Sequence, residues 1–293
     1  MARVGIFDSG VGGLSVWREI ASRSPALETV YVADQAHIPY GPRSLEEIRA
    51  FSHAITRFLL DRGCGTVVLA CNTASAAALA ALRLEFPRVP FVGMEPAVKP
   101  AAATSRSRVA GVLATPATFQ GELFATTVER FAAGGRVVQQ VCPGLVERIE
   151  AGLLDGDGTE MLLRECLAPS IAAGADTIVL ACTHYPFVRH TIERLVGPGV
   201  AVIDPSPAIA RQVARVTGHT PRPAQPSGTA AHGGAHANER MPQAEPVFFT
   251  TGATRAFEKV ASRLLARPVR ARQAHWRDGA LHSDTTSSAA PGA

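Results

Sequence analysis

Two cysteines occupy matching positions in this sequence of 293 residues. Cys71 follows the apolar run at 66–70, and Cys182 follows the closely similar run at 177–181. Each is followed by hydroxyl or amide residues and by a stretch expected to begin a helix, whose N-terminus favours a thiolate. A lone cysteine is more often a small buried hydrophobic residue. Two of them in equivalent settings favour a chemical role.

A pair of thiols suits the inversion of a carbon centre. Inversion requires a base on one face of a planar intermediate and an acid on the other. Because a thiol has a pKa of about 8.5, one cysteine can be the thiolate while the other stays protonated. Hydroxyls such as those of Ser9, Thr73 and Thr183, together with backbone N–H groups, could stabilise the charge that develops. This scheme requires no pyridoxal phosphate, so we expect no cofactor.

The segment Asp8–Gly13 (DSGVGG) is a second candidate, because its glycines allow a ligand to approach backbone N–H groups. It does not match the dinucleotide fingerprint, since Ser15 stands where the third glycine is expected, and it has no Walker lysine. A simple tight turn is the competing interpretation. Asp8, which directly precedes the glycines, is expected to point into a cleft at the end of its strand.

His184 lies two residues after Cys182, but no CxxC or HxxxH spacing completes a zinc site, so we predict no metal. Without further context it is a hydrogen-bonding residue. Tyr40 and Gly41 indicate only a loop, and Glu150, which precedes Gly152, would ordinarily be a solvated helix residue. Three further histidines are expected to be solvated: His219, His232 and His236.

Short β-branched runs alternate with helical patterns along the chain, which is typical of βα units and mainly parallel sheets. The predicted strands are 3–7, 29–33, 66–70, 90–93, 109–114, 136–141, 177–181, 200–203 and 247–250. One helix is well marked, because Ser44 and Glu47 form a capping box and Gly63 supplies a stop.

Three motifs at strand ends occur twice. The pairs are 66–71 with 177–182, 5–9 with 111–115 and 95–97 with 204–206, at offsets of 111, 106 and 109 residues. One shared apolar strand would be unremarkable, since buried parallel strands look alike. Three similar offsets predict two similar α/β domains related by pseudo-two-fold symmetry, with the active site in the cleft between them.

We predict a first domain from 1–97 and 207–269 and a second from 98–206. The cleft is expected at the carboxyl ends of the strands, so that one cysteine comes from each side. Residues 219–245 lack periodicity and predict a mobile insert. The tail 270–293 is predicted to be disordered and dispensable for chemistry.

Composition narrows the function classes. Apolar residues make up 46% and charged residues 18%, as in globular proteins. The net charge of +4 is mild, so no nucleic-acid partner is predicted, and no apolar run is long enough to span a membrane. The first residues lack a signal peptide's apolar region, which predicts a cytoplasmic protein. The five cysteines are therefore expected to be reduced: Cys64, Cys71, Cys142, Cys166 and Cys182.

The sequence closely resembles the glutamate racemases of the aspartate/glutamate racemase family. The similar segments occur in the family's order: 6–15 (IFDSGVGGLS), 33–34 with 39–41 (AD and PYG), 70–75 (ACNTAS) and 180–186 (LACTHYP). The resemblance extends from Arg3 to Ile209 and resumes at 248–252 (FFTTG). It does not extend to 219–245 or to the tail.

This resemblance implies a two-domain fold and the interconversion of L- and D-glutamate for peptidoglycan synthesis. It implies Cys71 and Cys182 as the acid/base pair, with support from Asp8, Glu150 and His184. The implied substrate contacts are Asp8, Ser9, Tyr40, Gly41, Asn72, Thr73, Thr183 and His184. Members of the family are commonly homodimers, which is the expected partner besides glutamate.

Two alternatives stay open. A sister racemase could use the same two thiols on aspartate or another small acidic substrate, although His184 and the DSGVGG segment favour glutamate. A binding protein that lost catalysis is the alternative from another class, and the presence of both Cys71 and Cys182 argues against it.

Overall fold

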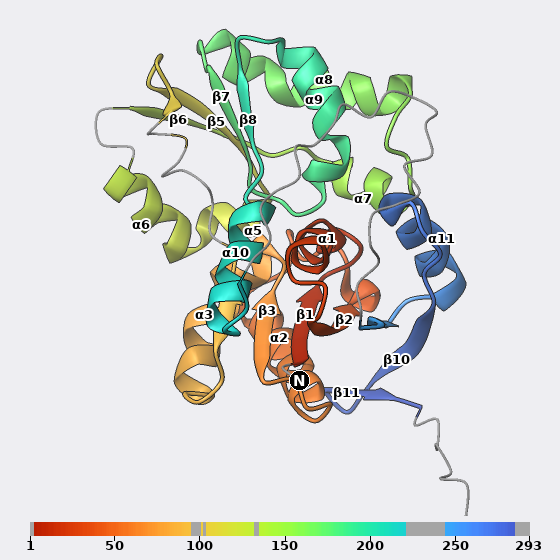
Figure 1. The fold of residues 1–293 in the computed structure, drawn as a ribbon. Coiled ribbons are helices and arrows are strands. Elements are labelled where there is room, and N and C mark those ends of the chain that lie inside the picture. Colours follow the sequence, from red (N-terminus) through yellow and green to blue (C-terminus); the bar gives the residue numbers. More distant parts are fainter. Residues whose placement is uncertain (1–2, 95–100, 102–103, 132–134, 221–243, 285–293) are drawn as a thin grey trace, which may run out of the picture.

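The chain folds around two β-sheets, each flanked by helices (Figure 1). The computed structural model describes every residue except 1–2, 95–100, 102–103, 132–134, 221–243 and 285–293. Strands and helices alternate along most of the chain, as the sequence pattern predicts.

The first sheet has seven strands in the order β11-β10-β9-β2-β1-β3-β4, and only β10 and β11 are antiparallel. The strands are β1 (Arg3–Asp8), β2 (Glu28–Ala33), β3 (Thr66–Leu69), β4 (Phe91–Gly93), β9 (Val247–Thr250), β10 (Ala271–Arg277) and β11 (Ala280–Ser283). All residues of β1 after Arg3 are buried, which is usual for a parallel strand that helices cover on both faces.

The second sheet has four parallel strands in the order β6-β5-β7-β8. They are β5 (Val109–Leu113), β6 (Arg136–Gln140), β7 (Thr177–Leu180) and β8 (Ala201–Ile203). This order repeats the order β2-β1-β3-β4 of the first sheet. The register repeats as well, because Gly5 pairs with Val67 and Gly111 pairs with Ile178. The prediction of two similar α/β units with mainly parallel sheets is confirmed, while motif 95–97 lies outside the described residues.

The helices connect and cover these strands. They are α1 (Leu14–Arg23), α2 (Leu45–Leu60), α3 (Asn72–Glu85), α5 (Pro116–Gln120), α6 (Glu122–Phe131), α7 (Leu145–Glu150), α8 (Asp157–Ala172), α9 (Arg189–Val196), α10 (Ser206–Val216) and α11 (Thr254–Leu265), with 3-10 helices η1 (Gln35–His37) and η2 (Tyr185–Val188). After the second sheet the chain returns to the first, since α10 and α11 both pack against α1 (Figure 1).

The predicted capping box begins α2. The Ser44 hydroxyl accepts the Glu47 N–H at 3.2 Å, and the Glu47 carboxylate accepts the Ser44 N–H at 3.0 Å. The helix ends at Leu60, and Gly63 follows with a φ of +74° that favours glycine. Helix α2 packs against α3, so this local signal contributes to the position of the helix that begins after Cys71.

One apolar cluster joins the two halves. Val11, in the turn before α1, and Leu14, the first residue of α1, belong to the same buried cluster as Leu180 and Tyr185 of the second half. Each such side chain contributes roughly 1.5–3 kcal/mol when it is removed from water. This burial holds the carboxyl ends of β1 and β7 against each other.

The tail prediction is wrong for its first part. Residues 271–283 form β10 and β11, and the first residues of β10 pair with β9. Ala274 and Leu281 are buried in the core beside α2, which supplies the apolar contacts that composition alone did not reveal. Residues 285–293 and most of the predicted insert at 219–245 lie outside the described residues.

The prediction of five reduced cysteines is also wrong. A disulfide joins Cys142 to Cys166, whose Cα atoms are 5.4 Å apart, while Cys64, Cys71 and Cys182 are free. Cys142 follows β6 and Cys166 lies on α8, which packs against β6. The pairing depends on this packing, which the spacing in the sequence did not indicate.

This pairing predicts the thiol count of the purified protein. When the chain is denatured without reductant, a colorimetric thiol reagent should find three thiols, corresponding to the free cysteines. After reduction it should find all five. The Cys142→Ser, Cys166→Ser double variant is the control and should give three thiols in both conditions. Five thiols in the unreduced wild type would contradict the disulfide.

Candidate active site

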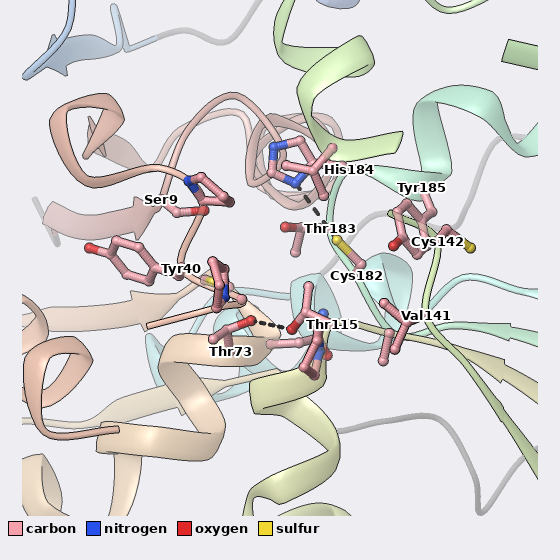
Figure 2. Close-up of a pocket in the computed structure, with 18 of the residues that line it drawn as sticks. Ser9, Tyr40, Thr73, Thr115, Val141, Cys142, Cys182, Thr183, His184 and Tyr185 are labelled. Atoms are coloured by element: carbon pink, nitrogen blue, oxygen red, sulfur yellow. Dashed lines mark hydrogen bonds between the residues drawn. The ribbon is translucent and has the colours of Figure 1, made fainter. Parts of the chain in front are cut away.

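A cavity of about 270 Å³ lies where the two sheets meet at their carboxyl ends (Figure 2). Both halves line it, and most of the residues predicted from sequence are present. The predicted residues among its walls are Ser9, Tyr40, Gly41, Cys71, Asn72, Thr73, Cys182, Thr183 and His184. The cavity therefore brings one cysteine from each half to the same space.

Cys71 is the N-cap of α3, as the sequence predicts. Its sulfur accepts the Ala74 N–H at 3.5 Å, and the residue is 5% exposed. Burial nevertheless raises the pKa of the Cys71 thiol, the nearby charge of Asp8 raises it further, and the N–H group only partly opposes them. The expectation that the helix N-terminus lowers the pKa of this thiol is therefore wrong, because burial has the larger effect.

Cys182 has a different setting from Cys71. No α-helix begins directly after it; the chain first makes the short 3-10 helix η2, whose N-cap is His184, and α9 follows at Arg189. The Cys182 sulfur lies 3.7 Å from Nδ1 of His184 (Figure 2). The two thiols thus occupy equivalent strand ends but have different partners, a backbone N–H for Cys71 and an imidazole for Cys182.

Glu150 holds the other side of the His184 ring. Its carboxylate lies 2.7 Å from Nε2 of His184, and both side chains are largely buried. Burial by itself would lower the pKa of His184, but the hydrogen bonds with Cys182 and Glu150 outweigh it and raise the pKa well above its usual range. The His184 ring thus lies between a carboxylate and a sulfur, and its hydrogen bonds with both favour the protonated ring.

The glycine-rich segment 8–13 packs closely against the side chains of Glu150 and His184. The Val11 N–H donates to Glu150 at 2.6 Å. A Cβ added at Gly10 would collide with the Glu150 carboxylate, and one added at Gly12 would collide with the His184 ring. Glycine is required here for close approach of two functional side chains of the chain itself, whereas the sequence predicted the approach of a ligand to the backbone of this segment.

Asp8 does not point into the cavity. Its carboxylate accepts N–H groups from Gly10 and Gly13 at 3.0 Å and the Thr183 hydroxyl at 3.3 Å, and the residue is fully buried. Burial raises its pKa although His184 and the two N–H groups oppose this. The expectation that it faces the cleft is wrong, because these donors fold the carboxylate back. Asp8 and Glu150 both lie behind the wall rather than in it.

Polar groups in the wall are arranged to receive a ligand. Both atoms of the Asn72 side-chain amide are buried and find no hydrogen-bond partner among the described residues. The hydroxyls of Thr73 and Thr115 are 2.8 Å apart, and Thr118 lies 2.9 Å from Thr115. An unpartnered buried amide beside a hydroxyl cluster is suited to a carboxylate ligand.

Thr115 is a site residue that the sequence analysis missed. The offset of 106 residues equates it with Ser9, so completing the repeat would have found it. The segment 141–147 also contributes to the wall, as does Tyr185. No motif marked this segment, because it reaches the cavity through the packing of α7.

No group of three or more histidine, cysteine or acidic residues that could hold a metal ion occurs in the described part of the chain. Among the same residues, no helix is long and apolar enough to cross a membrane.

The fold and the cavity agree with the results of sequence comparison. The family model "Asp/Glu/Hydantoin racemase" matches residues 7–213, so the chain belongs to this family of racemases. A glutamate racemase of Pseudomonas paraeruginosa is 55% identical over 215 residues, which cover 73% of this chain and 81% of the relative.

Two solved structures have the same fold. The glutamate racemase isoform RacE1 from Bacillus anthracis is 29% identical, with a TM-score of 0.79 over 95% of this chain and 98% of its own. The Escherichia coli glutamate racemase, solved with L-glutamate and the activator UDP-MurNAc-Ala, is 30% identical, with a TM-score of 0.76 over 93% of this chain and 97% of its own.

The raised pKa of His184 predicts a pH-dependent contribution to stability. A group whose pKa is higher in the folded chain stabilises the fold fully below its unfolded pKa, about 6.5 for histidine, and this stabilisation is lost as the pH rises through the folded pKa. Glu150→Gln keeps the shape but removes the charge. We expect it to cost roughly 2–3 kcal/mol of unfolding free energy at about pH 6 and less at about pH 9.

Urea unfolding at both pH values measures this difference. Glu165→Gln, which changes an exposed carboxylate on α8, is the matched control and should have little effect at either pH. An equal loss at both pH values for Glu150→Gln would contradict the imidazolium–carboxylate pair.

Proposed function

We propose that this protein is a glutamate racemase that interconverts L- and D-glutamate with two cysteines and no cofactor. The main support is the cavity in which Cys71 comes from one half and Cys182 from the other. The relatives that are glutamate racemases at 50% identity and above support the choice of substrate.

In the proposed first step from L-glutamate, Cys182 is the base. The imidazolium of His184 beside its sulfur stabilises negative charge there. The α C–H bond breaks, the proton goes to the Cys182 sulfur, and the electron pair moves into the α-carboxylate. Hydrogen bonds to that carboxylate from donors such as the buried Asn72 amide, which has no partner among the described residues, stabilise the charge.

In the second step Cys71 supplies a proton to the opposite face. Burial raises the pKa of the Cys71 thiol and so favours the protonated form, which this direction requires. A new C–H bond forms with inverted configuration, and Cys71 is left as the thiolate while Cys182 is a thiol. D-Glutamate reacts through the same steps in reverse. The burial of Cys71 and the imidazole beside Cys182 therefore both favour the protonation states that the reaction from L-glutamate requires.

The other groups have supporting roles in this proposal. Asp8 fixes Thr183 and the glycine segment, and Glu150 fixes His184. Ser9, Tyr40, Gly41 and Thr73 are proposed substrate contacts in the wall. The reaction would supply D-glutamate for peptidoglycan in the cytoplasm. The homodimer and the domain boundaries at 97, 206 and 269 stay predictions.

The substrate prediction is that L-glutamate is racemised without added cofactor and that L-aspartate is a poor substrate. The side-chain carboxylate of glutamate is one methylene farther from the reacting carbon, so aspartate cannot reach the same donors without displacing its α-carbon. Circular dichroism on each amino acid measures the rates. Equal rates would favour the sister activity on aspartate, and activity that needs pyridoxal phosphate or a metal would contradict the mechanism.

The mechanism predicts that both thiols are required. Cys71→Ala or Cys182→Ala should abolish racemisation of both enantiomers, a loss of about 10³-fold or more, since one face then lacks its acid or base. Cys64→Ala is the matched control, because this buried free thiol lies outside the cavity, and its activity should be close to wild type.

Isotope exchange tests the same point in the wild type. In deuterated water the product formed early should contain solvent deuterium, while recovered substrate contains little, because the incoming proton comes from the opposite cysteine. If substrate is labelled as fast as product, or if either alanine variant keeps near wild-type activity, the two-thiol assignment is wrong.

A further inference from the structure

We infer that Trp276, in the C-terminal hairpin, is a positioning residue for the substrate cavity. It acts through the buried carboxylate of Asp34 on Tyr40 and on the wall segment that follows. This inference rests on the proposed function, because its effect is read on glutamate.

The hairpin places an indole N–H on a buried charge. Nε1 of Trp276 donates to Oδ1 of Asp34 at 2.7 Å, across 242 positions of sequence. Asp34 is fully buried at the end of β2. A buried carboxylate must have hydrogen-bond donors, so the loss of one donor changes the preferred position of the whole group.

Asp34 also holds the cavity wall. Its other oxygen, Oδ2, accepts the Tyr40 hydroxyl at 2.7 Å and lies 2.9 Å from Nδ1 of His37. Thr251 donates to Oδ1 at 2.9 Å. Tyr40 and Gly41 line the cavity directly. The Asp34 carboxylate thus connects Trp276, which lies on the side away from the cavity, to Tyr40 in the cavity wall.

Ring contacts support the same arrangement. The Trp276 ring lies edge-on to His37 with centroids 4.9 Å apart, and His37 stacks on Phe51 at 3.9 Å. Phe51 in turn contacts Tyr40 at 5.8 Å. These ring contacts hold the faces of the His37 and Tyr40 rings, while the Asp34 carboxylate holds Nδ1 of His37 and the Tyr40 hydroxyl.

The wall segment also touches the second half of the molecule. The Ala117 N–H donates to the Gly41 carbonyl at 3.3 Å, and a Cβ at Gly41 would press on Thr115. A shift of Tyr40 and Gly41 would therefore change the space beside the hydroxyl cluster of Thr73 and Thr115. Because this region contacts the substrate away from Cys71 and Cys182, we expect an effect on KM rather than on kcat.

The test is Trp276→Phe, which keeps a ring and removes the N–H. KM for L- and D-glutamate should rise about 3- to 10-fold while kcat stays within about twofold, as expected when a hydrogen bond that orders a binding wall from behind is lost. In a Tyr40→Phe background the same change should raise KM by less than about 1.5-fold, since the path from Asp34 to the wall is already broken.

Two controls separate positioning from loss of stability. Leu281→Ala removes a buried side chain opposite Trp276 in the hairpin, and His275→Ala changes an exposed neighbour. Leu281→Ala should lower Tm with KM unchanged, and His275→Ala should alter neither. If Trp276→Phe changes KM by less than twofold, or if Leu281→Ala raises KM equally, the inference is wrong.

An independent readout does not need activity. With ¹⁵N-labelled tryptophan, the indole signals of Trp17 and Trp276 can be assigned by Trp276→Phe. The Trp276 signal should exchange slowly with solvent and shift in both Asp34→Asn and Tyr40→Phe. If the wild type does not racemise glutamate, the proposed function fails. The indole signal would still show whether Trp276 is linked through Asp34 to Tyr40. An indole signal unchanged in both variants overturns it.

Discussion

The carboxylate of Glu150 is the point at which the two halves of the molecule are joined at the active site. It belongs to the second half through α7, yet it accepts hydrogen bonds from Val11 and Gln35 of the first half at 2.6 and 2.8 Å. The same group faces His184 at 2.7 Å. A charge in this position is stable only while all of its donors stay in place. The relative placement of the halves and the charge on the histidine are therefore set together.

This junction explains how a repeated fold becomes an asymmetric site. The repeat gives equivalent positions to Cys71 and Cys182 and to Thr73 and His184, at the offset of 111 residues. Where the first half has a threonine hydroxyl, the second has an imidazolium. The repeat supplies two thiols that line one cavity from different halves, and the groups beside them differ, a backbone N–H for Cys71 and an imidazole for Cys182.

Much of the fold could be predicted from the sequence, because parallel strands and capping boxes are local patterns. All nine predicted strands are present, and so is the capping box at Ser44. The positions of the two cysteines follow from the repeat. The errors concern properties that depend on burial: the pKa of Cys71, the direction in which the Asp8 carboxylate points, and the folding of residues 271–283 into strands.

Partners that are distant in sequence are the other source of error. The disulfide of Cys142 with Cys166 and the contact of Trp276 with Asp34 both require packing between separate elements. No periodicity or spacing indicates them. The repeat did contain one unused prediction, since Thr115 occupies the position equivalent to Ser9.

Three buried carboxylates surround a cavity that is proposed to receive an anion, and this arrangement requires an explanation. Asp8, Asp34 and Glu150 all lie behind the wall, and each is supplied with N–H or O–H donors from other segments. The wall that faces the ligand combines apolar side chains with amide, hydroxyl and thiol groups, the ring of His184 and the carboxylate of Glu147, and the Asn72 amide has no partner among the described residues. An anionic substrate therefore meets the donors of Asn72 and of the hydroxyl cluster together with the ring of His184, while the carboxylates behind the wall hold neighbouring segments and His184 in position.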